Sequence, residues 1–225
     1  MRGAVVAVAV LVGSAGSASA NVEGGQIDTF ESDVAGWSNT FGAPTTSWTA
    51  SGGPGGAADA YMTIETNGSP SGPGSRLGAW NGIQWSGDYV GQGITQIRID
   101  IAGFEGPGAE LRLQFLSNVG SQFTSLNSVF VPTDSVWRTY TFDISENGMF
   151  QTGGASDYAD SFADVTRMHL RHQPGAPGGF GSPPAYDGRI GIDNVRAVPG
   201  PAGLGVLSSG LLAGFWRGRR AGRRA

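Results

Sequence analysis

Period-two alternation of apolar and polar residues is the feature that most limits how this chain can fold. Residues 96–102 place three isoleucines on one face and polar side chains on the other. Residues 110–116, 137–145 and 166–172 repeat the pattern. Such alternation is typical of strands that bury one face and expose the other, and it favours antiparallel pairing.

The spacing of these segments predicts the fold class. The chain contains 39 glycines and 12 prolines, which separate the short alternating segments, yet 39% of its residues are hydrophobic. No segment keeps a 3.6-residue apolar period. We therefore predict an all-β antiparallel β-sandwich over residues 21–198, most simply a jelly roll, with the first and last strands as neighbours. Residues 150–164 are polar and are expected to form an irregular excursion, with at most one helical turn around residues 161–165.

Charge and cysteine content exclude several functions. All 14 cationic residues are arginines, and six of them lie at Arg2 and within residues 217–224. The remaining eight face 18 acidic residues, so the central region is acidic and unsuited to nucleic acid. The absence of cysteine excludes disulfides, zinc thiolate sites and cysteine nucleophiles.

The first twenty residues have the anatomy of a secretory signal peptide. Arg2 precedes an apolar run, and the small residues Ala18-Ser19-Ala20 form an A-x-A cleavage signal. This segment predicts export, with a mature start near Asn21.

The C-terminal residues 199–225 combine a proline pair, an apolar stretch and an arginine cluster. In this order they resemble a PEP-CTERM sorting signal, although Gly200 stands where that family has glutamate. The resemblance implies a Gram-negative host, processing by an exosortase and transient anchoring in the inner membrane. As a helix, residues 202–216 reach about 22 Å, which is marginal for a hydrocarbon core of ~30 Å.

The central region resembles secreted jelly-roll modules, including carbohydrate-binding, laminin-B-type and discoidin-like domains. The resemblance rests on residues 27–37, 137–145, 165–172 and 190–195. In calcium-bearing modules of this kind, acids near the first strand and in the last strand share a structural ion. The matching positions are Glu31, Asp193 and, more weakly, Asp28, so the resemblance implies a structural Ca²⁺ here. The alternative is that these acids are solvated or cap turns.

Aromatic residues between positions 77 and 89 are the candidate sugar contacts. Trp80, Trp85 and Tyr89 could stack on sugar rings, and neighbouring polar residues such as Asn81 could bind hydroxyl groups. The alternative is that these aromatic side chains fill the core, as we expect for Trp37 and Trp137.

Catalytic signatures are missing from the sequence. His169 and His172 are three residues apart on a strand and are expected at the surface or an edge, not as a metal pair. No nucleophile elbow, zinc-protease motif or phosphate loop occurs. We therefore predict a non-enzymatic, exported surface or matrix protein that binds extracellular polysaccharide. The alternatives are a structural biofilm protein without a small ligand and, less favoured, a polysaccharide-active enzyme.

Overall fold

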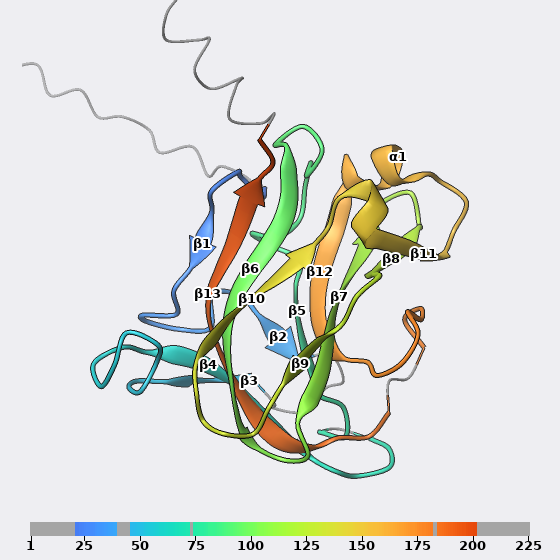
Figure 1. Ribbon diagram of the computed structural model, residues 1–225. Coiled ribbons are helices and arrows are strands. Elements are labelled where there is room, and N and C mark those ends of the chain that lie inside the picture. The colour runs from blue at the N-terminus through green and yellow to red at the C-terminus, as the bar shows by residue number, and fades with distance from the viewer. Residues whose placement is uncertain (1–20, 40–45, 73, 182–183, 202–225) are drawn as a thin grey trace, which may run out of the picture.

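Two antiparallel sheets form the computed structural model, which describes residues 21–201 except 40–45, 73 and 182–183 (Figure 1). Within these residues, sheet A has the order β10 (Arg138–Asp143), β6 (Ile94–Glu105), β13 (Asp187–Pro199), β4 (Tyr61–Asn67) and β3 (Thr46–Thr49), with β1 (Ile27–Asp28) paired to β13. Sheet B has the order β11 (Met149–Gly153), β8 (Gln122–Ser125), β7 (Ala109–Ser117), β12 (Val165–His172), β5 (Gly78–Asn81) and β2 (Ser38–Asn39), with β9 (Val129–Val131) paired to β7. The helical elements are η1 (Glu146–Gly148) and α1 (Tyr158–Phe162). The predicted β-sandwich is confirmed.

The core lies between the sheets and follows the alternation of the sequence. From sheet A, β6 buries its three alternating isoleucines completely. From sheet B, β7 buries Leu111, Leu113 and Phe115, and β12 adds Met168 and Leu170. Each of these side chains contributes about 1.5–3 kcal/mol by leaving water. The alternate residues of the same strands therefore form the two outer faces.

The first and last strands are neighbours, as predicted. Strand β1 pairs antiparallel with β13, and Asp28 lies opposite Val195 (Figure 1). The pattern of residues 27–31 predicts a longer first strand than the two residues that β1 contains. Phe30 has a φ of 52°, in the left-handed region, and buries its ring in the core. A strand cannot continue through that backbone conformation.

The predicted irregular excursion at residues 150–164 is more ordered than its polarity suggested. It contains most of β11 and all of helix α1, whose first turn is capped by the side chain of Asp157. Phe162, at the end of α1, is fully buried, with its ring centroid 5.0 Å from that of Phe115. Burial of the Phe162 ring thus stabilises this segment although its local sequence is polar.

Both predicted targeting segments lie outside the described residues, namely the signal peptide (1–20) and most of the sorting tail, including its apolar stretch (202–216). Strand β13 extends to Pro199, one residue beyond the predicted boundary, and the Gly200 amide donates to the Gly93 carbonyl. No helix in the part of the chain that the structure describes is long and apolar enough to cross a membrane.

One carboxylate organises the aromatic residues at one end of the core. Asp28 Oδ2 accepts the indole N–H of Trp37 at 2.8 Å and that of Trp85 at 2.7 Å. Tyr89 joins the group by donating its hydroxyl to the Trp85 carbonyl at 2.9 Å. Burial raises the pKa of Asp28, and the two indole hydrogen bonds oppose that rise. Trp37 is in the core, as predicted, at 2% exposure. The same prediction for Trp137 is wrong, because its ring is only partly buried and packs against Tyr61 and Phe104 on the outer face of sheet A.

We predict that Asp28→Leu destabilises the chain by about 2–5 kcal/mol, because two buried indole N–H groups lose their acceptor at about 1–3 kcal/mol each. Asp28→Asn keeps an acceptor oxygen and should cost less. Chemical denaturation of the full-length chain measures both, with Asp160→Leu on the exposed surface as the control. Equal stability of the Leu variant and the wild type would contradict this role.

Candidate functional site

The outer face of sheet B carries a row of aromatic and polar side chains that crosses four strands. Pairing places His169 of β12 opposite Trp80 of β5 on one side and opposite Gln114 of β7 on the other. Gln114 in turn lies opposite Thr124 of β8. The alternation that sends Met168 into the core sends these side chains outward. We call Trp80, His169, Gln114 and Thr124 the polar row.

Aromatic contacts hold one end of the polar row together. The Trp80 and His169 rings are stacked, with centroids 6.2 Å apart and planes inclined by 25°. Phe180 meets His169 edge-on at 4.7 Å. The Arg167 guanidinium lies 5.5 Å from the Trp80 ring and 5.8 Å from the Phe180 ring. Cation–π attraction of this kind fixes the orientation of both the cation and the rings.

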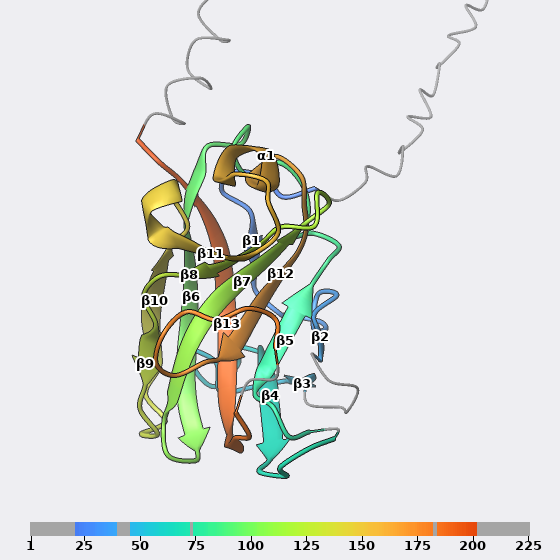
Figure 2. The ribbon, with the colours of Figure 1, turned by 90° about the vertical axis from the view of Figure 1, so that its right-hand side faces the viewer.

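A loop between β12 and β13 covers the polar row. Figure 2 shows this loop, in orange, crossing in front of β7. Gln114 Nε2 and the Thr124 hydroxyl donate to the Gly178 carbonyl, at 2.7 and 2.9 Å. Arg171 donates to the Gly179 carbonyl at 3.0 Å, and Arg112 donates to the Gly175 carbonyl. We call residues 174–181 the lid loop.

Burial under the lid loop changes the protonation of this face. His169 is 3% exposed and Arg171 is 2% exposed. Desolvation, aided by the charges of Arg167 and Arg171, lowers the pKa of His169 to about 3. Desolvation alone lowers the pKa of Arg171 to about 10. At neutral pH the face therefore holds a neutral imidazole among charged guanidinium groups.

Polar atoms without a hydrogen-bond partner gather on the same face. Within the described residues, both ring nitrogens of His169 are unpaired, and so is one side-chain atom in each of four neighbouring residues. The four atoms are Arg112 Nε, Gln114 Oε1, Arg167 Nε and Arg171 Nε. Buried polar groups are normally paired, so an unpaired cluster marks where water or a ligand can bind.

Of the four predicted sugar contacts, only Trp80 lies on this face. Trp85 and Tyr89 are completely buried in the core, so their prediction as ligand contacts is wrong. Asn81 is also completely buried and is used structurally. Its Nδ2 donates to the Ala35 carbonyl and its Oδ1 accepts the Ile83 amide, both at 2.9 Å. The side chains of Asn81, Trp85 and Tyr89 can be buried because their polar atoms form hydrogen bonds within the protein.

The basic residues of the site do not stand out in the sequence. The alternation predicts His169 at the surface or an edge and places Arg112, Gln114 and Arg171 on the solvent-facing side of their strands, but the structure buries all four. The available signal was an Arg-x-His-x-Arg alternation on one strand followed by a loop rich in glycine and proline. Nothing local shows that this loop folds back over the strand that precedes it.

The predicted metal residues do not come together as a set of three. Asp28 is engaged by two indole groups in the core, which corrects its assignment as a ligand. Glu31 and Asp193 are coupled through their charges. Burial raises the pKa of Asp193 to about 7, and the charges of Asp59, Asp100 and Glu31 add to the rise. Among the described residues, no group of three or more Asp, Glu or His side chains could hold a metal ion. Calcium binding by Glu31 and Asp193 stays a prediction.

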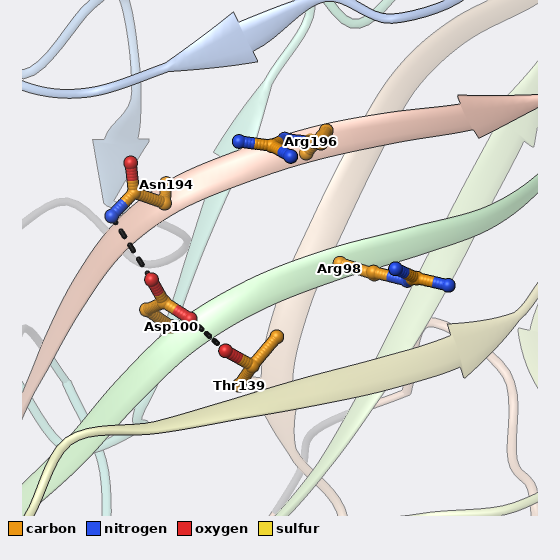
Figure 3. Close-up of a pocket in the computed structure, with 5 residues that line it drawn as sticks. All are labelled: Arg98, Asp100, Thr139, Asn194 and Arg196. Atoms are coloured by element: carbon orange, nitrogen blue, oxygen red, sulfur yellow. Dashed lines mark hydrogen bonds between the residues drawn. The ribbon is translucent and has the colours of Figure 1, made fainter.

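A hollow of about 340 Å³ lies on the outer face of sheet A (Figure 3). Its lining residues are Arg98, Asp100, Thr139, Asn194 and Arg196. Asp100 accepts hydrogen bonds from the Thr139 hydroxyl and from Asn194 Nδ2, so its carboxylate is already engaged. The two arginine head groups point away from each other (Figure 3). This arrangement offers fewer converging groups than the face of sheet B.

No protein-family model and no curated protein sequence matches the chain. Among solved structures, the fold is similar to a family 11 carbohydrate-binding module of Clostridium thermocellum in complex with a β-1,3-1,4-mixed-linked tetrasaccharide. The TM-score is 0.51 at 15% identity, over 79% of this chain and 97% of that one. A family 11 module of a cellulosomal cellulase from the same bacterium gives 0.50 at 16% identity, over 80% and 96% of the two chains.

An exo-β-agarase gives a TM-score of 0.56 at 15% identity, over 80% of this chain but 25% of the agarase. Likeness at these identities establishes the fold alone. The chain is a jelly-roll β-sandwich of the kind found in family 11 carbohydrate-binding modules.

We predict that the free energy of unfolding falls as the pH rises from about 4 to about 7. The folded state keeps a proton on Asp193 that the unfolded chain releases near its usual pKa of 3.8, so folding is favoured at the lower pH. A shift of this size corresponds to about 4 kcal/mol at most. Urea denaturation at pH 4.5 and 8 measures the effect, and Asp193→Asn should flatten it. An unchanged slope in that variant would contradict the assignment.

We further predict that Ca²⁺ raises the melting temperature at pH 8, because a cation relieves the repulsion among these carboxylates. EGTA should reverse the rise, and Asp193→Asn should abolish it. Melting that is identical with Ca²⁺ and with EGTA would exclude calcium binding by Glu31 and Asp193.

Proposed function

We propose that this chain is an exported surface or matrix protein whose β-sandwich binds polysaccharide on the outer face of sheet B. One observation carries the proposal, namely the polar row in a fold shared with carbohydrate-binding modules. It combines a half-buried indole with hydrogen-bonding side chains in register across four strands. Binding sites of this composition, aromatic surfaces with a few placed polar groups, suit small sugars.

The proposed binding needs no catalysis. The Trp80 ring takes the apolar C–H face of a sugar ring, and His169, Gln114 and Thr124 bind its hydroxyl groups. Neutral His169 can both donate and accept a hydrogen bond, which matches a hydroxyl group. The pKa of about 3 keeps the imidazole in that neutral state at neutral pH. The row crosses the strands, so a glycan chain would lie across sheet B.

The similar structures support this proposal by what they contain. One is a module solved with a bound tetrasaccharide, and another belongs to an agarase, of which the matching part is a quarter. The likeness to part of a larger enzyme fits a binding role for the sandwich. A polysaccharide-active enzyme is the least favoured alternative.

A structural protein without a small ligand is the second candidate, and a specific observation favours it. The lid loop already occupies the polar row and satisfies Gln114 Nε2 and Thr124. If the loop never leaves this position, the sandwich is a building block of an extracellular polymer. Glycan binding distinguishes the two candidates.

We predict that Trp80→Ala lowers glycan affinity about tenfold or more, because truncating a central aromatic anchor removes most of a hot spot. The full-length chain is tested by isothermal titration calorimetry against a panel of neutral and acidic polysaccharides. The matched control is Trp137→Ala, on the outer face of sheet A, where the indole donates to the Gly52 carbonyl at 3.0 Å. Absence of binding to every glycan by the folded wild type would leave the structural candidate.

Export and sorting form the second part of the proposal. We propose that residues 1–20 are removed on secretion and that residues 199–225 direct exosortase processing after transient anchoring in the inner membrane. Mass spectrometry of protein recovered from its native cells is expected to find a start near Asn21 and loss of the arginine cluster. Recovery of a chain that still ends at Ala225 would contradict processing.

A further inference from the structure

The charges on the outer face of sheet B are unbalanced. Arg112, Arg167 and Arg171 point to this face, and none of them has an ion pair within the described residues. Among the strands of sheet B and the lid loop, the one acidic residue is Glu110. Its carboxylate influences Arg112 but also accepts the Gly175 amide at 3.3 Å. One carboxylate, which acts on Arg112, therefore stands against three guanidinium groups on this face.

Two of these arginines face each other directly. Arg112 of β7 lies opposite Arg171 of β12 in the antiparallel register, and they are 4% and 2% exposed. Like charges directly opposite on neighbouring strands are unfavourable, and burial without a counter-charge adds to the cost. The arrangement is what a site for an anion requires when the anion is absent.

Both arginines present the same guanidinium edge to the lid loop, and Arg112 also donates Nη1 to the Ser125 and Leu126 carbonyls at 2.7 and 2.6 Å. Each donates Nη2 to a lid carbonyl, Arg112 to Gly175 and Arg171 to Gly179, and each leaves Nε unpaired. Nε and Nη2 form one edge of the guanidinium, and that edge binds a carboxylate through two parallel hydrogen bonds. The lid carbonyls thus satisfy half of each edge with neutral oxygens.

The lid loop is suited to being displaced. Residues 174–181 read Pro-Gly-Ala-Pro-Gly-Gly-Phe-Gly, with no charged side chain and with Phe180 as the one large apolar group. Most of its hydrogen bonds to the sheet run from the side chains of Arg112, Gln114, Thr124 and Arg171 to backbone carbonyls. Two more run from the Gly175 and Phe180 amides to the side chains of Glu110 and Gln122, both at 3.3 Å. A segment with few buried apolar contacts opens at low free-energy cost.

We propose that the outer face of sheet B selects acidic polysaccharides, whose uronate carboxylates bind the Nε–Nη2 edges of Arg112 and Arg171 after displacing the lid loop. This inference rests on the proposed glycan-binding function and specifies its ligand class. The ligand carboxylate replaces the lid carbonyls and neutralises the paired arginines. The Trp80 ring binds a neighbouring sugar ring of the same chain.

The test compares the full-length chain with polygalacturonate, a neutral mixed-linked β-glucan and dextran sulfate by isothermal titration calorimetry. Polygalacturonate should bind about tenfold or more tightly than the neutral glucan. Arg171→Gln should remove that preference, and Arg171→Lys should restore it only in part, because lysine keeps the charge but lacks the two-pronged edge. The control is Arg138→Gln, an exposed arginine of sheet A paired with Asp134.

Hydrogen exchange supplies a second measurement that does not depend on a variant folding. Exchange within residues 174–181 should rise when polygalacturonate binds, because the lid loop leaves the sheet. Slower exchange there on binding would overturn displacement. Equal affinity for the three polymers, or full polygalacturonate affinity in the folded Arg171→Gln variant, would overturn uronate selection. Trp80-dependent binding of neutral glucan alone would refute this inference while leaving the proposed function intact.

Discussion

The carboxylate of Asp28 is the interaction on which one whole end of this sandwich depends. Two indole N–H groups are buried beside it, and a buried donor without an acceptor is costly. By accepting both, Asp28 lets Trp37 and Trp85 enter the core and brings β1 into place beside β13. Because the chain has no cysteine, this polar contact and the aliphatic core provide the stability that disulfides provide in many small secreted domains.

The two outer faces of the sandwich bury charged groups of different sign. On sheet A, burial raises the pKa of Asp193 to about 7, and the charges of Asp59, Asp100 and Glu31 add to the rise. On sheet B, arginines and a neutral histidine lie under a loop that has no charged side chain. The buried carboxylate of Asp193 and the buried guanidinium groups of Arg112 and Arg171 thus lie on opposite outer faces of the sandwich.

The lid loop explains how a site can be both built and covered. Its glycine carbonyls supply oxygens to Arg112, Arg171 and Gln114 in the absence of a ligand. These bonds satisfy part of the polar face, but several buried nitrogen and oxygen atoms on it still have no hydrogen-bond partner. We propose that a ligand with more oxygen atoms than the lid loop binds these unpaired atoms as well. The additional hydrogen bonds would favour displacement of the loop.

The alternation of the sequence determined the sandwich, because a strand that buries one face must place every second residue there. It also predicted that Met168 and Leu170 point inward, and the jelly-roll fold class predicted that the first and last strands meet. The candidate site was predictable only in Trp80. Trp85 and Asn81 have the same local character as Trp80, but Asp28 and Ala35, distant in sequence, supply their hydrogen-bond partners.

The tertiary structure decided which of the outward-pointing side chains remain exposed to solvent. Arg112, Gln114, His169 and Arg171 read as ordinary surface positions, and only the return of residues 174–181 over β7 and β12 buries them. That return depends on contacts between segments up to about sixty residues apart, which local periodicity does not encode. Local pattern sets the direction of a side chain, whereas its surroundings are set by whatever part of the chain folds back upon it.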